Sequence, residues 1–425
     1  MSSFHVLKSS VSGSVHIPPS KSQTLRAILF AALAKGKSRV LSPLLSNDSK
    51  AMLKAVEIMG AQVKKGDEGL VIEGTGGKIG PFGDIVDVGN SGICLRFLSA
   101  LFALSDFPAV ITGDKSIRTQ RPMGKLIRAL RELGASVTCM KEEGFAPLLI
   151  QGPLRGAKAT LSGEDSQPVS ALLIASALKK TPTEIKVKHP GELPWIEVTL
   201  DWLHRLDVSY EREGYELYRL EGNKVFEPFD YTVPGDFSSA AFPLAAALIT
   251  GSEITLENLD LSDPQGDKAI LEVVQKMGAK LEIDEKNRQV KVLKGSRLKG
   301  LEIDVNAFID AVPILAVLGC YAEGKTVLKN AKVAREKECD RLKASQTELK
   351  KMGANIRSTP DTLVIEKSEL KGANVFSHHD HRMAMALAVA AMGAKGETTV
   401  ESIDCVGKTY PSFKVDFIGM GAKIR

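Results

Sequence analysis

Six stretches of the chain are apolar at nearly every position, and each one begins with polar residues. A helix that is apolar on all sides must be buried, so each stretch predicts a buried helix with a polar first turn. Their starts recur at intervals of roughly 69 to 75 residues, near Lys21, Asn90, Asp165, Asp236, Asp310 and Asp380. Because similarity at a fixed period indicates a repeated structural unit, we expect six copies of one unit.

A second, amphipathic helix is predicted after most of the buried ones. It ends in an apolar residue followed by glycine and alanine, and the glycines are Gly60, Gly134, Gly278, Gly353 and Gly421. Glycine just past a helix end fits a left-handed conformation that a Cβ atom would disfavour. The third copy departs from this pattern, with Asp207 at the same place. Short β-branched runs follow, such as 70–73 and 289–293, and predict strands joined by tight turns.

These patterns predict an α/β protein of two similar domains, each built from three repeated units. Parallel buried helices would be surrounded by short-stranded mixed sheets, since 425 residues are too many for one ordinary core. The pattern is interrupted at 231–235, and the segment 1–18 precedes the first buried helix, so it is expected to complete the last unit's sheet. We therefore expect one domain at 19–233 and the other at 1–18 with 234–425.

Composition narrows the class of protein. Apolar residues make up 44% of the chain and charged residues 25%, as in globular proteins. The net charge of +5 is spread without a long basic run, which argues against a nucleic-acid-binding protein and leaves room for small acidic substrates. With no apolar run of membrane-spanning length and no signal-peptide core, we expect a cytoplasmic protein that does not bind membranes. The five cysteines include no CxxC pair, so neither a zinc site nor a disulfide framework is indicated.

The polar first turns of the six helices are candidate binding groups. A helix N-terminus carries partial positive charge and exposed N–H groups, and it therefore favours anions. If the three buried helices of each domain point the same way, their tips converge. The pattern thus predicts an anion-binding active site in the cleft between the domains.

Seven motifs in chain order resemble the 5-enolpyruvylshikimate-3-phosphate synthase family, an enolpyruvyl transferase family. They are PPSKSQTLRA, GNSGICLRFL, IRTQRPMGKLI, IDAVP, REKECDRL, HDHRMAMALA and GKTYPSF. The resemblance spans nearly the whole chain and fits the six-unit architecture of that family. It implies transfer of the enolpyruvyl group of phosphoenolpyruvate to the 5-hydroxyl of shikimate 3-phosphate, with release of phosphate and without a metal or organic cofactor.

The resemblance also implies roles for individual residues. The expected catalytic residues are Lys21, Asp310, Glu338 and His381. The residues expected to bind shikimate 3-phosphate are Lys21, Ser22, Arg26, Ser166, Gln167, Asp310 and Lys337. Those expected to bind phosphoenolpyruvate are Lys21, Gly92, Arg121, Gln167, Arg341, Arg382 and Lys408. Glu338 is our first choice for the group that moves a proton to and from C3 of phosphoenolpyruvate.

Two acidic residues depart from the family pattern near the expected phosphate pocket. Asp165 and Glu192 stand where many members have serine. An aspartate beside a phosphate is repulsive, so we expect Asp165 to cap the helix or to pair with a nearby cation. His378 and His381 flank a helix start and could suggest a metal, but no further ligand stands near them, so no metal is expected.

Two other functions fit parts of the pattern. One is a UDP-N-acetylglucosamine enolpyruvyl transferase, which is expected to carry a reactive cysteine before the arginine-proline pair; residues 114–121 contain none. The other is a phosphometabolite-binding scaffold that has lost turnover, for which Asp165 and Glu192 are the only support. We expect a monomer with small-molecule substrates and no nucleic-acid partner.

Overall fold

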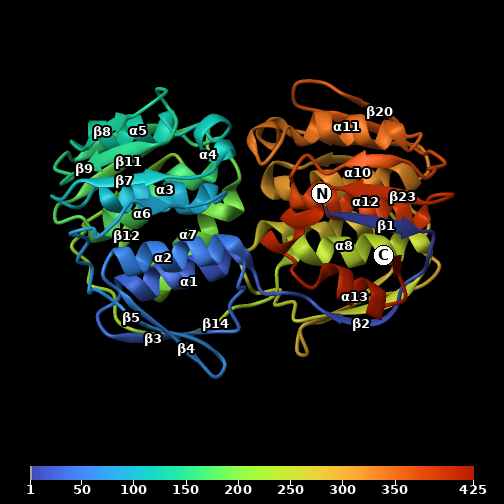
Figure 1. Cartoon of the computed structure of the whole chain (residues 1–425), viewed down its shortest axis with the longest axis horizontal. Helices are drawn as coiled ribbons and strands as arrows, with labels where there is room; N and C mark the ends of the chain where they lie inside the picture. Colours follow the sequence, from blue (N-terminus) through green and yellow to red (C-terminus); the bar gives the residue numbers. More distant parts are fainter. Residues whose placement is uncertain (1) are drawn as a thin grey trace. The chain divides into compact units, whose positions relative to one another are not determined.

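The computed structural model describes residues 2–425, and the chain forms two compact units. One unit is Pro19–Val233, and the other combines Met1–Pro18 with Pro234–Arg425. In Figure 1 the first is coloured blue to green and the second yellow to red, with the blue N-terminal strands added to it. Each unit has a continuous hydrophobic core of its own.

The unit Pro19–Val233 contains three buried helices, each followed by a second helix and by short strands. In chain order its elements are α1 (Lys21–Leu33), β3 (Lys37–Leu41), α2 (Asn47–Ile58), β4 (Gln62–Gly66), β5 (Gly69–Glu73), β6 (Val86–Asp87), α3 (Gly92–Phe102), β7 (Ala109–Thr112), α4 (Lys115–Thr119), α5 (Gly124–Glu132), β8 (Ser136–Cys139), β9 (Leu148–Gln151), β10 (Lys158–Ser162), α6 (Ser166–Leu178), β11 (Thr183–Lys188), α7 (Leu193–Arg205), β12 (Tyr210–Glu213), β13 (Leu217–Leu220) and β14 (Asp230–Thr232).

The other unit repeats this order and adds four short 3₁₀ helices. Its elements are β1 (Ser3–Leu7), β2 (Ser12–His16), α8 (Phe237–Thr250), β15 (Glu253–Glu257), η1 (Gly266–Lys268), α9 (Ala269–Lys276), β16 (Leu281–Asp284), β17 (Gln289–Val292), β18 (Glu302–Asp304), η2 (Asn306–Ala311), α10 (Val312–Tyr321), β19 (Lys325–Lys329), η3 (Lys332–Glu336), α11 (Arg341–Lys351), β20 (Asn355–Ser358), β21 (Leu363–Glu366), β22 (Asn374–Phe376), α12 (His381–Gly393), β23 (Thr398–Glu401), η4 (Ile403–Lys408), α13 (Phe413–Gly419) and β24 (Lys423–Ile424).

Six four-stranded sheets share one topology. Each has a parallel pair at one edge, followed by two strands in antiparallel pairing. The strand orders are β14-β3-β5-β4, β6-β7-β9-β8, β10-β11-β13-β12, β2-β15-β17-β16, β18-β19-β21-β20 and β22-β23-β1-β24. Identical topology in all six sheets confirms the repeat inferred from the hydrophobic pattern.

The strands before Pro18 join two different sheets. β1 lies between β23 and β24 in the last unit's sheet, as expected, and Ser3 pairs with Glu401. β2 instead runs parallel to β15 of the fourth unit, with Ser12 opposite Glu253. The sequence did not predict this second pairing.

The helices expected to be buried are buried along almost their whole length. α12, for example, is buried from His381 to Met392. In the unit that contains them, α8, α10 and α12 pack pairwise against one another, with β1 and β23 drawn beside them in Figure 1. This arrangement of buried helices and mixed, short-stranded sheets confirms the predicted α/β class.

The second helices end as their glycines predicted. Gly60, Gly278 and Gly421 have φ of 102°, 105° and 102°, in the region that glycine tolerates best. Asp207, which replaces glycine in the third copy, also has a positive φ, 53°. The turn therefore keeps its left-handed backbone even where the residue type changes.

The structure adds detail at three helix starts. α3 is capped by Ser91, whose Oγ accepts from the Cys94 N–H, and not by Asn90. Asp310 does not begin α10; it lies in η2, and α10 follows with Pro313 in its first turn, where a missing N–H is tolerated. Pro122 precedes Met123, the N-cap of α5, and so lies just outside that helix.

Candidate active site

The candidate residues form two groups, one in each unit. In Pro19–Val233, three of them meet around Gly92, the first residue of α3. A Cβ atom at Gly92 would lie 2.9 Å from Nη1 of Arg96, 3.8 Å from Cζ of Arg121 and 3.8 Å from Oε1 of Gln167. A side chain at this position would crowd the guanidinium of Arg96. Gly92, Arg121 and Gln167, expected to share one ligand, therefore lie together.

Arg96 holds this group in place, and the residue-by-residue expectation had not included it. It is buried, and its Nη1 donates to Oε1 of Gln167 at 3.1 Å. Its Nη2 donates to the carbonyl oxygen of Pro122 at 3.3 Å and lies 3.2 Å from a carboxylate oxygen of Asp165. One side chain thus joins α3, α6 and the segment before α5. The sequence signal was its place near the start of α3, where a buried charge needs partners.

Arg26 is fixed by α7 and lies next to α3. Its Nε and Nη2 donate to Oγ1 of Thr199 at 3.0 and 2.9 Å, and Nη2 also reaches the carbonyl oxygen of Trp195 at 3.4 Å. Its guanidinium lies over the ring of Phe97 at 5.1 Å. Arg26 belongs to α1, and the half-buried Lys21 and Ser22 begin the first turn of that helix.

The first turn of α6 is capped by acidic side chains of the chain itself. Asp165 is the N-cap, and its Oδ1 accepts from the Gln167 N–H at 3.1 Å. Together with its ion pair to Arg96, this confirms both roles that the sequence suggested for Asp165. Oε2 of Glu192 accepts from the Ser166 N–H at 3.0 Å and from the Ser166 hydroxyl at 3.2 Å.

The second group, in the other unit, is centred on Arg341. This side chain is almost fully buried, and each of its three nitrogens donates to a different carboxylate. Nε reaches Asp380 at 2.8 Å, Nη1 reaches Asp310 at 2.6 Å and Nη2 reaches Glu338 at 2.9 Å. Burial lowers the pKa of Arg341, but the charges of Asp380, Asp310 and Glu338 outweigh it, and the net result is a pKa well above the ordinary value. Arg341 is therefore a permanent cation that fixes the positions of two expected catalytic carboxylates.

Two further cations extend this group. The second oxygen of Asp310 pairs with Nη2 of Arg382 at 2.8 Å. Glu338 accepts from Nζ of Lys408 at 2.9 Å, and both side chains are only 9% exposed. Nε and Nη1 of Arg382 are buried, and among residues 2–425 they have no hydrogen-bond partner. Buried donors in this state are suited to receiving an anionic ligand.

His381 and Lys337 are next in sequence to residues of this group. His381 is the first residue of α12 and is buried, with Nδ1 4.0 Å from Oδ1 of Asp380. Asp380 itself caps α12 by accepting from the N–H groups of Arg382 and Met383. Lys337 is half-buried in the segment between η3 and α11.

Asp267 was missed by the sequence reasoning. It lies in η1, is buried, and neither carboxylate oxygen has a hydrogen-bond partner among residues 2–425. Burial raises the pKa of Asp267 well above its usual value, the negative charge of Asp310 raises it further, and Arg382 lowers it. The only sequence signal was an isolated acidic residue before an amphipathic helix, which is more often an exposed cap.

His378, beside the start of α12, contacts a buried glutamate. Nε2 of His378 lies 2.8 Å from Oε1 of Glu348, which is buried, so this histidine is accounted for by an ordinary polar contact. Among residues 2–425, no three histidine, cysteine, aspartate or glutamate side chains are grouped so that they could hold a metal ion. In the same range, no helix combines the length and apolar character required to span a membrane.

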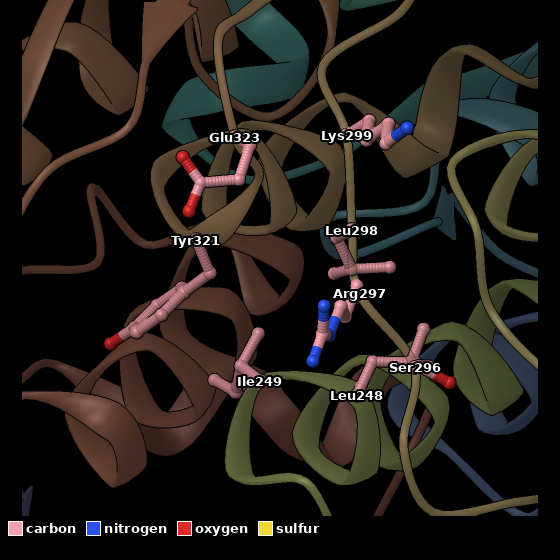
Figure 2. A pocket seen from close by; sticks show the side chains of 8 residues that line it. All are labelled: Leu248, Ile249, Ser296, Arg297, Leu298, Lys299, Tyr321 and Glu323. Atoms are coloured by element: carbon pink, nitrogen blue, oxygen red, sulfur yellow. The ribbon is translucent and has the colours of Figure 1, made fainter.

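A cavity of about 570 Å³ lies elsewhere in the second unit (Figure 2). It is lined by Leu248 and Ile249 near the C-terminal end of α8, by Tyr321 at the end of α10, and by the segment 296–299. Asp310 precedes α10, at the opposite end of that helix from Tyr321, and the 10 residues of α10 span about 15 Å. The cavity is therefore separate from the candidate active site, and no expected site residue lines it.

The chain was compared with known proteins. Residues 7–417 match the sequence family described as EPSP synthase (3-phosphoshikimate 1-carboxyvinyltransferase). A 3-phosphoshikimate 1-carboxyvinyltransferase of Methanothrix thermoacetophila is 45% identical, over 99% of this chain and 98% of the relative. One of Acetivibrio thermocellus is 43% identical, over 97% of this chain and 96% of the relative.

Solved structures agree with the sequence comparison. EPSP synthase from Acinetobacter baumannii superposes with a TM-score of 0.82 at 30% identity, covering 100% of this chain and 99% of that chain. The enolpyruvyl transferase NikO from Streptomyces tendae shares the fold, with a TM-score of 0.79 at 17% identity and coverage of 100% and 98%. Relatives of this identity and coverage favour a 3-phosphoshikimate 1-carboxyvinyltransferase over a UDP-N-acetylglucosamine enolpyruvyl transferase. The chain belongs to the EPSP synthase (3-phosphoshikimate 1-carboxyvinyltransferase) family.

Proposed function

We propose that this chain transfers the enolpyruvyl group of phosphoenolpyruvate to the 5-hydroxyl of shikimate 3-phosphate and releases inorganic phosphate. One observation supports the proposal above all others: the family match runs from residue 7 to residue 417. The residues whose roles the resemblance implied are also the ones gathered in the two groups described above.

The proposed reaction has two steps. In the first, the 5-hydroxyl oxygen bonds to C2 of phosphoenolpyruvate, the hydroxyl loses its proton and C3 gains one, which gives a tetrahedral ketal phosphate. In the second, the C2–O bond to phosphate breaks and C3 loses a proton, which restores the double bond. The chemistry therefore needs one group that accepts the hydroxyl proton and one that both gives and takes a proton at C3.

Asp310 and Glu338 are the proposed proton-transfer groups. Both oxygens of Asp310 accept from guanidinium groups, and both oxygens of Glu338 accept from cations. Cations at both oxygens stabilise the ionised form of a carboxylate, and this form can take a proton. We assign the hydroxyl proton to Asp310 and the C3 proton to Glu338, which must carry a proton that it gives to C3 in the first step and takes back in the second. His381 and Lys21 are the proposed supporting groups.

The anionic parts of both substrates are assigned to the cations of the two groups. Arg121 and Lys408 would hold phosphoenolpyruvate with Arg382, whose unpartnered donors suit an anion, and with Arg341, Gln167 and Gly92. Arg26 and Ser22 would hold the carboxylate of shikimate 3-phosphate, and Ser166, Gln167 and Lys337 its phosphate. Charges fixed in position before the reaction stabilise the transition state without rearrangement. We expect one copy of the chain to act by itself, and the family resemblance implies no cofactor.

The test is a phosphate-release assay with both substrates together and with each one alone. We expect release only when both are present, together with formation of 5-enolpyruvylshikimate 3-phosphate by mass spectrometry. Release with UDP-N-acetylglucosamine as acceptor would instead support the other enolpyruvyl transferase branch. Tight binding of both substrates without any release would identify a scaffold that has lost turnover.

A further inference from the structure

Glu192 is held in a conformation that is unusual for a glutamate. It precedes α7 with φ 48° and ψ 40°, in the left-handed region that a Cβ atom disfavours. Its side chain is buried, with 2% of its surface exposed. It makes no capping hydrogen bond to α7, although it stands at the N-cap position of that helix. A buried charge on a strained backbone requires strong partners elsewhere.

Those partners are the leading donors of α6. Oε2 of Glu192 accepts from the N–H and the hydroxyl of Ser166, and the next N–H, that of Gln167, donates to Asp165. The N-terminus of a buried helix is a favourable place for an anion. At α6, the first two N–H groups and the Ser166 hydroxyl already serve carboxylates that belong to the chain. Glu192 thus occupies the position of an anionic ligand.

We propose that Glu192 is a specificity-determining residue that competes with the 3-phosphate of the substrate for the donors of Ser166. The inference rests on the proposed function, which assigns this phosphate to Ser166 and Gln167. A phosphate oxygen and the Glu192 carboxylate accept from the same N–H and O–H groups, and two anions cannot share them without repulsion. Binding of the phosphate therefore requires the carboxylate to leave Ser166.

This competition changes what the phosphate contributes to affinity. Part of its interaction with α6 is offset by the loss of the Ser166–Glu192 hydrogen bonds, so the phosphate adds less binding than it would in an unoccupied site. A serine at position 192 would remove the competing charge and could donate a hydrogen bond to the phosphate. The preference for shikimate 3-phosphate over unphosphorylated shikimate is therefore smaller in this chain than in a Glu192→Ser variant.

Isothermal titration calorimetry of the intact protein with shikimate 3-phosphate and with shikimate tests this inference. We expect Glu192→Ser to bind shikimate 3-phosphate at least about tenfold more tightly than the wild type, the factor that corresponds to one charge-assisted hydrogen bond. Shikimate affinity should change far less. Asp201→Ser is the matched control, since it removes a negative charge from α7, the helix that Glu192 precedes, and disrupts an i,i+4 pair with Arg205 instead of the contact with Ser166.

A second variant keeps the inference testable if the first variant does not fold. Glu192→Gln keeps an oxygen acceptor for Ser166 and removes the charge, so it should also gain affinity for shikimate 3-phosphate if Glu192→Ser fails to fold. The inference is wrong if the folded variant binds this ligand no more tightly than the wild type, or if both ligands change equally. Wild-type protein that releases no phosphate would refute the proposed function alone, because the binding comparison does not depend on turnover.

Discussion

Glu338→Gln separates proton transfer from binding. The carboxylate accepts from Arg341 at 2.9 Å and from Lys408 at 2.9 Å, and it is almost fully buried. Glutamine keeps the shape and one oxygen acceptor, but it has no titratable group. Its amide would also point an N–H group at one of the two cations. The substitution therefore removes the proposed acid/base function and weakens one side of the ion-pair network.

The two effects differ in size. A general acid or base contributes roughly 100- to 10,000-fold to rate, so kcat should fall by about that factor. Loss of a hydrogen bond to a charged partner typically costs about 1.5–3 kcal/mol of stability, which would lower the melting temperature without unfolding the protein. Substrate affinity should change by less than about 1.4 kcal/mol, or tenfold, because Arg341 keeps its bonds to Asp310 and Asp380.

The assay combines steady-state phosphate release with calorimetric binding of phosphoenolpyruvate in the presence of shikimate 3-phosphate. Glu336→Gln is the matched control, since this exposed glutamate lies two residues away in the same segment. It should behave like the wild type in both measurements. Circular dichroism melting curves of both variants test whether the fold is kept.

Two results would refute the assignment. A Glu338→Gln variant with nearly normal turnover would clear Glu338 of proton transfer and direct attention to His381 or Lys21. Loss of binding together with turnover would show instead that the carboxylate supports Arg341 and Lys408 structurally.

Three further substitutions test other parts of the structure. Arg121→Ala should weaken phosphoenolpyruvate binding about tenfold or more, because it removes a charge-assisted contact. Arg118 is exposed, and Arg118→Ala should leave this affinity unchanged. Equal affinities of the two variants for phosphoenolpyruvate would exclude the assigned pocket. Gly92→Ala would place a Cβ atom 2.9 Å from Nη1 of Arg96, so the KM for phosphoenolpyruvate should rise with little change in melting temperature. Gly83→Ala is the control, because the space around Gly83 is open, and an unchanged KM in Gly92→Ala would contradict the expected crowding. The raised pKa makes Asp267 in the folded protein retain a proton that the unfolded chain releases near pH 4. The Asp267→Asn variant lacks this titration, so its stability relative to the wild type should increase as the pH rises from about 4 to 8. Wild-type stability therefore falls by about 1.4 kcal/mol for each pH unit that separates the unfolded pKa from the folded pKa of this carboxyl. Parallel melting-temperature profiles of the two proteins would contradict that reasoning.

The sequence determined the repeat and the local ends of its helices. All-round apolar stretches fixed which helices are buried, and Gly60 or Gly278 marked helix ends, because both signals depend only on neighbouring residues. The ordered motifs also named most of the residues that gather in the two groups. Even the two roles of Asp165 followed from its place at a helix start beside cations.

Tertiary structure decided which charges meet. The three carboxylates on Arg341 come from positions 310, 338 and 380, and the partner of Ser166 comes from position 192. Asp267 is buried where η1 packs against η2, α8 and α9, and β2 joins a sheet more than 200 residues away in the chain. A hydrophobic pattern records whether a residue is buried and with what period, but not which distant residue it meets. That choice is made by the packing of whole elements, since a buried polar group takes whichever partner the packed fold brings within hydrogen-bond distance.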